Sequence, residues 1–150
     1  LTRRSDSQLD FDLELAKRQS NDNPVYYIQY AHARMCGVLK EMRERGGKPE
    51  EIARAEIPPE IFAGGEARKL VDCLALFPKE IENASRELAP HAVTGYTLNL
   101  AGCFHSFYNS NRILGEARPL EAGRLALLEA ARVVLARCLA LLGVSAPERM

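Results

Sequence analysis

Two tyrosines and an arginine recur at helical spacing near the start of the chain. Tyr27, Tyr30 and Arg34 are three and four residues apart, so at about 100° per residue they share one side of a helix. That side points about 140° away from a stripe of mostly apolar residues on the same segment. The stripe consists of Val25, Ile28, His32, Met35, Leu39 and Met42. Phenol rings stack on unpaired nucleobases, and hydroxyl and guanidinium groups donate hydrogen bonds to them. The pattern predicts either a contact with single-stranded RNA or packing under a neighbouring segment, with Arg34 in a salt bridge.

A second segment, residues 94–114, also has two faces. Its apolar side comprises Tyr96, Leu100, Phe104, Phe107, Tyr108 and Leu114, and we expect Tyr108 in the core with its hydroxyl satisfied inside. Its other side holds Gly102, His105, Asn109 and Arg112. These polar groups either contact RNA or pack and cap against a neighbouring helix.

Residue sets that carry catalysis or bind metals are missing from the sequence. There is no Gly-Lys-Ser/Thr phosphate loop, and the three histidines lack the spacing of metal ligands. The four cysteines are at least 30 residues apart and lie in apolar contexts, which predicts buried free thiols in a reducing compartment. His32 lies on the apolar stripe, so we expect a hydrogen-bonded core histidine. We expect no catalysis, metal or cofactor in this chain alone.

The elements that position these residues are all expected to be helices. Asn23 and Pro24 predict an N-cap and first helical residue, and Gly46-Gly47 and Gly143 predict helix ends. A connector at 46–65 holds four glycines and three prolines, with one short turn near 49–54. The expected helices span 9–19, 24–45, 66–77, 78–88, 94–114 and 119–142. The predicted fold class is all-α, a bundle of about five to six helices.

Composition limits the partners that the chain can have. Its 150 residues include 20 basic and 20 acidic side chains, so the net charge is zero. That balance disfavours a partner bound by bulk electrostatics and leaves RNA recognised at a few stacking positions. No apolar run is long enough to span a membrane, and residues 1–10 do not resemble a signal peptide, so we expect a cytoplasmic protein. A start at Leu1 suggests a fragment.

Four blocks of the sequence resemble one family. Asn23-Pro-Val-Tyr-Tyr-Ile-Gln-Tyr-Ala-His-Ala-Arg34 is similar to the opening of the anticodon-binding domain of arginyl-tRNA synthetases. Asp10-Phe-Asp-Leu-Glu-Leu-Ala16, Phe104-His-Ser-Phe-Tyr-Asn109 and Leu141-Leu-Gly-Val-Ser-Ala-Pro-Glu-Arg-Met150 also resemble this family. The blocks occur in the family's order along essentially the whole chain. The resemblance implies the helical C-terminal domain of a class I aminoacyl-tRNA synthetase.

The resemblance also implies a function and site residues. The helix that meets the anticodon loop of tRNA(Arg) in this family has positions matched by Tyr27, Gln29, Tyr30 and Arg34. Met150 matches a terminal residue that helps enclose a flipped anticodon base. The base that the family reads most strongly is the middle cytosine. The tail is expected beside Tyr30 with its carboxylate near Arg34. His105, Asn109 and Arg112 remain possible RNA contacts from the pattern alone.

The expected organisation separates a junction from a domain. Residues 1–20 are expected to lead from an absent catalytic domain, which uses ATP with Mg to ligate arginine to its tRNA, and residues 21–150 to form the anticodon-binding domain. The family's ATP-site motifs do not occur here. The expected partners are the anticodon stem-loop and the parent's own catalytic domain, and the chain is expected to be a monomer. An alternative is a protein-docking bundle with little RNA affinity, because the first helix alternates apolar residues with acids.

Overall fold

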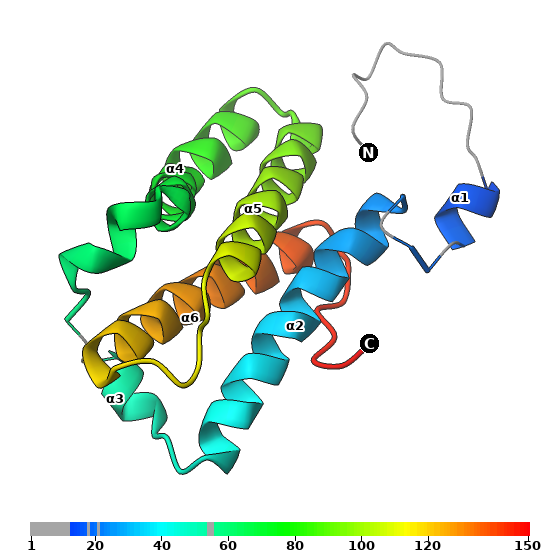
Figure 1. Cartoon of the computed structure of the whole chain (residues 1–150). Helices are drawn as coiled ribbons and strands as arrows, with labels where there is room; N and C mark the ends of the chain where they lie inside the picture. Colours follow the sequence, from blue (N-terminus) through cyan, green and yellow to red (C-terminus); the bar gives the residue numbers. More distant parts are fainter. Residues whose placement is uncertain (1–12, 18, 21, 54–55) are drawn as a thin grey trace.

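The computed structural model describes residues 13–17, 19–20, 22–53 and 56–150, and throughout these ranges the regular elements are helices. They are α1 (Leu13–Lys17), α2 (Pro24–Glu44), α3 (Pro49–Ala53), the 3₁₀ helix η1 (Pro59–Gly64), α4 (Glu66–Arg86), α5 (Pro90–Ser110) and α6 (Arg118–Leu141) (Figure 1). The predicted all-α bundle is confirmed. Of the first expected helix, residues 13–17 are helical, Gln19 is not, and residues 9–12 and 18 lie outside the described residues.

Local capping explains where α2 begins and where α2 and α6 end. The Asn23 side-chain oxygen accepts a hydrogen bond from the backbone N–H of Val25 at 3.1 Å, and a proline occupies the first helical position. Gly46 and Gly143 adopt φ angles of 85° and 69°, which turn the chain out of each helix. The start predicted at Asn23 and the helix ends predicted at these two glycines are therefore confirmed.

The predicted break at Pro78 is wrong, because α4 continues through it. An interior proline removes one backbone hydrogen bond and costs about 3 kcal/mol. Packing offsets that cost: α4 lies along α5, with Leu70 and Cys73 buried and the Phe77 ring 5.9 Å from that of Tyr96. Pro78 itself is exposed, so its ring points away from this contact.

Other predicted boundaries also shift. The helix expected at 94–114 spans Pro90–Ser110, because Pro90 starts it and Asn111 is extended. The connector at 46–65 contains η1 as well as the expected turn, which is α3. η1 packs directly on α6: a Cβ added to Gly123 would lie 2.5 Å from the Ile61 Cδ1. The connector is therefore part of the packed structure.

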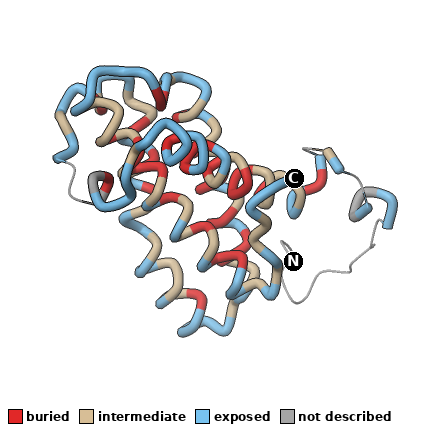
Figure 2. Tube along the Cα trace, turned by 90° about the horizontal axis from the view of Figure 1, so that it is seen from below, coloured by how far each residue is buried: buried red, intermediate tan, exposed pale blue. Residues whose placement is uncertain are grey.

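The core lies between α6 and the helices around it. α6 contacts α2, α3, α4, α5 and η1, so it lies at the centre of the bundle. The largest fully buried side chains are Phe104, Phe107, Met35, Leu70, Leu100, Leu128, Leu135 and Leu139. Figure 2 shows buried residues along the facing sides of the helices and exposed ones outside. None of the helices in the described ranges combines the length and apolar character that crossing a bilayer requires.

Candidate nucleic-acid interface

Helix α2 has the two faces that its sequence predicts, with one exception. Ile28, Met35, Leu39 and Met42 are buried. Val25, which the periodicity places on the same stripe, is 43% exposed, so that part of the prediction is wrong. It lies in the first turn of α2, where it lines a surface hollow together with Lys17 of α1.

The other face of α2 meets α5 in a group of rings that we call the ring cluster: Tyr27, Tyr30, Arg34, His105 and Tyr108. The His105 ring centroid lies 4.8 Å from that of Tyr27 and 6.0 Å from that of Tyr30. The Arg34 guanidinium carbon lies 4.3 Å from the Tyr108 ring centroid and 5.5 Å from that of Tyr30. All five residues are half-buried. The predicted grouping on α2 is present, and α5 covers part of it.

Arg34 is a cation without an anionic partner in the ring cluster. Within the described ranges its guanidinium forms no ion pair with a carboxylate, so the salt bridge expected from packing alone is absent there. Its contacts are with the faces of two phenol rings, which attract cations through their quadrupoles. Tyr108, which was expected in the core, is half-buried, and its ring lies under the Arg34 guanidinium.

His105 is the neutral partner of that cation. Burial lowers the pKa of His105 below its ordinary 6.5, the charge of Arg34 lowers it further, and a hydrogen bond to the backbone of Tyr27 opposes both. Its Nε2 is buried and makes no hydrogen bond. Burial also raises the pKa of the Tyr27 hydroxyl, with a smaller contribution from Cys103. At neutral pH the ring cluster therefore combines three phenol rings, one cation and a neutral imidazole whose buried Nε2 makes no hydrogen bond.

The C-terminal tail docks on a different flank of α2 (Figure 1). The Gln29 side-chain nitrogen donates to the Ser145 carbonyl at 2.9 Å and to its hydroxyl at 3.1 Å. The Nδ1 of His32 donates to the Pro147 carbonyl at 2.9 Å, and His32 is 3% exposed. The prediction of a hydrogen-bonded core histidine is confirmed. Gln29 lies about 140° around the helix from Arg34. Among the described residues no ion pair joins Arg34 to the terminal carboxylate, and the expected proximity of the two stays a prediction.

A hollow of about 520 Å³ lies where the tail meets the first turns of α2. Val25, Tyr26, Gln29 and Met150 contribute apolar surface and an amide to its lining. The structure therefore places two of the predicted site residues, Gln29 and Met150, on the lining of one hollow. It also adds Tyr26, which the sequence analysis did not select; its ring lies parallel to that of Tyr30, with centroids 6.3 Å apart. The spacing of four residues between these tyrosines is the signal that was available.

The three remaining candidates separate. His105 joins the ring cluster, and Asn109 lines a groove between α4 and α5. Arg112 follows α5, and its Nε donates to the Leu114 carbonyl at 3.0 Å. Arg112 thus stabilises the loop after α5 and is not in the ring cluster.

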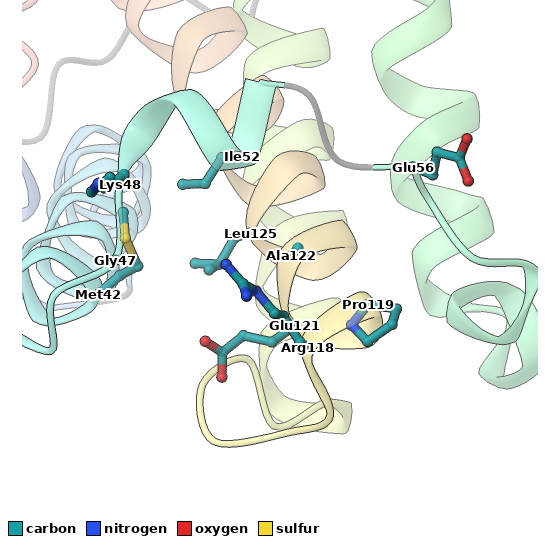
Figure 3. A pocket seen from close by; sticks show the side chains of 10 residues that line it. All are labelled: Met42, Gly47, Lys48, Ile52, Glu56, Arg118, Pro119, Glu121, Ala122 and Leu125. Atoms are coloured by element: carbon teal, nitrogen blue, oxygen red, sulfur yellow. The ribbon is translucent and has the colours of Figure 1, made fainter.

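A further hollow, of about 420 Å³, lies at the opposite end of α2 (Figure 3). Ile52 and Leu125 point into it from α3 and α6, and its rim carries charges of both signs, including Lys48 and Glu121. Its wall residue Met42 is 15 positions along α2 from Tyr27, roughly 22 Å at the rise of a helix. It is therefore separate from the ring cluster. No group of three potential metal ligands occurs among the described residues.

Known proteins resemble this chain along nearly its whole length. It is 50% identical over 151 residues to an arginine–tRNA ligase of Desulforudis audaxviator, matching 100% of this chain and 26% of that protein. The arginine–tRNA ligase of Desulforamulus reducens is 48% identical over 148 residues, matching 99% and 26%. The chain thus spans about a quarter of the length of these curated relatives.

Solved structures and a family model agree with that relationship. An arginyl-tRNA synthetase of Thermus thermophilus superposes with a TM-score of 0.73 at 30% identity, over 96% of this chain and 24% of that one. One of Campylobacter jejuni gives 0.83 at 27% identity, over 99% and 31%. The model of the DALR anticodon binding domain matches residues 28–150. The chain therefore belongs to the DALR anticodon binding domain family.

Proposed function

We propose that this chain is the tRNA-recognising end of an arginyl-tRNA synthetase and holds the anticodon stem-loop of tRNA(Arg). The family match and the similarity to arginine–tRNA ligases support this assignment. The parent would ligate arginine to its tRNA in the cytoplasm, using ATP with Mg bound in a catalytic domain outside this chain. Residues 1–20 would join that domain to the anticodon-binding domain at 21–150.

The observation that carries the proposal is Arg34 in the ring cluster, a cation that contacts aromatic faces and no carboxylate in the described ranges. Splayed RNA bases are held by aromatic rings and guanidinium planes and by hydrogen bonds to their edges. Tyr27, Tyr30 and Arg34 supply these groups on one side, and Gln29 and Met150 line the adjoining hollow. An unpaired anticodon base would lie at this end of α2, with Met150 closing its outer side.

Loss of stacking should be measurable by titration. One stacked base contributes about 1–3 kcal/mol, so Tyr30→Ala should weaken stem-loop binding roughly 5- to 150-fold. Deletion of Met150 should weaken it as well. Because the net charge is zero, the salt dependence should be shallow, which means few phosphate contacts.

The experiment compares a cognate anticodon stem-loop with one carrying a different central base. Arg34→Ala should weaken binding as well. Arg43→Ala is its matched control, because Arg43 is exposed near the far end of the same helix. Circular dichroism checks that helicity is retained. Equal affinities of the original chain, Tyr30→Ala and the Met150 deletion for both stem-loops would refute the proposed site.

A second candidate function is docking to another protein with little RNA affinity. Its supporting observation is exposed apolar surface: Leu13 on α1 is 53% exposed and Leu141 at the end of α6 is 59% exposed. Light scattering at several concentrations separates the two. Self-association without stem-loop binding would favour docking, whereas a monomer that binds the stem-loop favours RNA recognition.

A further inference from the structure

Two cysteines lie at the same level of the neighbouring helices α4 and α5, which run side by side in opposite directions (Figure 1). A short turn, residues 87–89, joins the two helices. Cys73 precedes Leu88 in this turn by as many residues as Cys103 follows it, as their numbers show. Equal numbers of residues rise equally along two helices. The two cysteines therefore lie opposite each other across the contact between α4 and α5.

Hydrogen bonds hold α5 against the backbone and the sulfur of Cys73. The Tyr96 hydroxyl donates to the Cys73 carbonyl at 3.1 Å, and the Asn99 side-chain nitrogen donates to the Cys73 sulfur at 3.6 Å. Asn99 is four residues before Cys103, so the two share one face of α5. The thiols also interact with each other, because burial, the charge of Cys103 and a hydrogen bond with its side chain raise the pKa of Cys73. A disulfide requires cysteine side chains that point toward each other, and this pair meets that requirement.

The two thiols differ in their access to solvent. Cys103 is half-buried and lines a groove of about 490 Å³ between α4 and α5. Cys73 is 4% exposed. A small dissolved oxidant can therefore reach the Cys103 sulfur first and finds Cys73 behind it. An accessible thiol next to a second thiol that can resolve its oxidation is the arrangement of a redox-sensitive cysteine pair.

The other two cysteines are less suited to such a reaction. Cys138 on α6 is near enough for its charge to contribute to the raised pKa of Cys73, but it is fully buried. An oxidant in solution does not reach it first. Cys36 lies apart on α2, where its sulfur is 3.8 Å from the Nδ1 of His32. The pair that oxidation should join is therefore Cys73 with Cys103.

We propose that Cys73 and Cys103 form a redox modification site, at which a peroxide converts the two thiols into a disulfide that links α4 to α5. The Cys103 sulfur, having released its proton, attacks one oxygen of hydrogen peroxide; the O–O bond breaks, a sulfenic acid forms, and the departing hydroxide takes the proton as water. The Cys73 sulfur then attacks the sulfenic sulfur, the S–O bond breaks, and the Cys73 proton leaves with the hydroxide as a second water. The two sulfurs lose two electrons, and one peroxide becomes two waters. This modification neither needs nor tests the proposed function.

The test treats the folded 150-residue chain with hydrogen peroxide and maps the products by mass spectrometry after digestion with trypsin. Cleavage after Lys and Arg places the four cysteines on four different peptides. We expect one linked pair, residues 70–79 joined to residues 87–112, which a reducing agent separates. In urea the fold no longer selects the partners, so a mixture of pairings should form.

Matched variants and a stability measurement complete the test. Cys103→Ser should abolish the linked pair, whereas Cys36→Ser should leave it unchanged, because Cys36 is equally half-buried but lies on another helix. The disulfide should raise the Tm of the original chain by roughly 4–16 °C, and the same treatment should not raise the Tm of Cys103→Ser. If the folded chain yields no linked pair, joins Cys73 to Cys138 instead, or loses stability when the bond forms, the proposal is overturned.

Discussion

The bond between His32 and the tail permits a quantitative prediction. His32 is 3% exposed, and its Nδ1 lies 2.9 Å from the Pro147 carbonyl. His32→Phe keeps a ring of similar size and removes the donor. The cost is the desolvation of an unpaired carbonyl, about 1–3 kcal/mol. The free energy of unfolding in urea should fall by that amount.

A double-mutant cycle assigns the loss to the tail. The second change is truncation after Gly143, which removes residues 144–150 and with them the acceptor. In the truncated chain water can hydrate the Nδ1 of His32, so His32→Phe should cost about 1–3 kcal/mol less there than in the intact chain. Gln29→Met is the comparison, because its bonds to Ser145 are exposed and should give a smaller coupling.

Additive effects would refute this reasoning. If the two changes add to within about 0.5 kcal/mol, the bond from His32 does not hold the tail on α2. A coupling in the expected range makes His32 an anchor of the hollow lined by Met150. His32→Phe should then also weaken stem-loop binding when the proposed site is correct.

Two further predictions concern stability. Burial and the charge of Arg34 lower the pKa of His105 in the folded state, so the unfolded chain takes up a proton first as the pH falls below about 6.5. The free energy of unfolding should therefore decrease until the pKa of His105 in the folded state is passed. His105→Gln should remove this part of the pH dependence, measured by urea titrations at pH 7.5 and 5. Pro78→Ala restores a backbone N–H inside α4 and should raise the free energy of unfolding by about 3 kcal/mol. An unchanged or lower value would show that the helix had already adapted to the proline.

Much of α2 could be predicted because its information is local. A cap at Asn23, a left-handed glycine at 46 and a regular apolar stripe are read from neighbouring residues. The same periodicity grouped Tyr27, Tyr30 and Arg34 correctly. Local reasoning could not show which segment covers that group, because α5 and the tail reach α2 from more than 70 residues away.

The errors share that cause. Pro78 is a strong local signal for a helix end, and packing of α4 along α5 overrides it. Val25 fits the apolar period, but among the described residues it lines a surface hollow and is 43% exposed. The sequence analysis did not select Tyr26, because the residue that lines the same hollow, Met150, is at the other end of the sequence.

The energies of the ring cluster explain why its cation is compatible with RNA binding. A half-exposed cation–π contact such as that between Arg34 and Tyr108 contributes about 0.5–1 kcal/mol. A stacked base contributes about 1–3 kcal/mol. A base can therefore replace the guanidinium on a tyrosine face with a net gain, and the released cation is free to hydrogen-bond the base or its phosphate. A salt bridge to a buried carboxylate would have been costlier to break, so the absence of such a partner in the described chain is what keeps Arg34 available to a ligand.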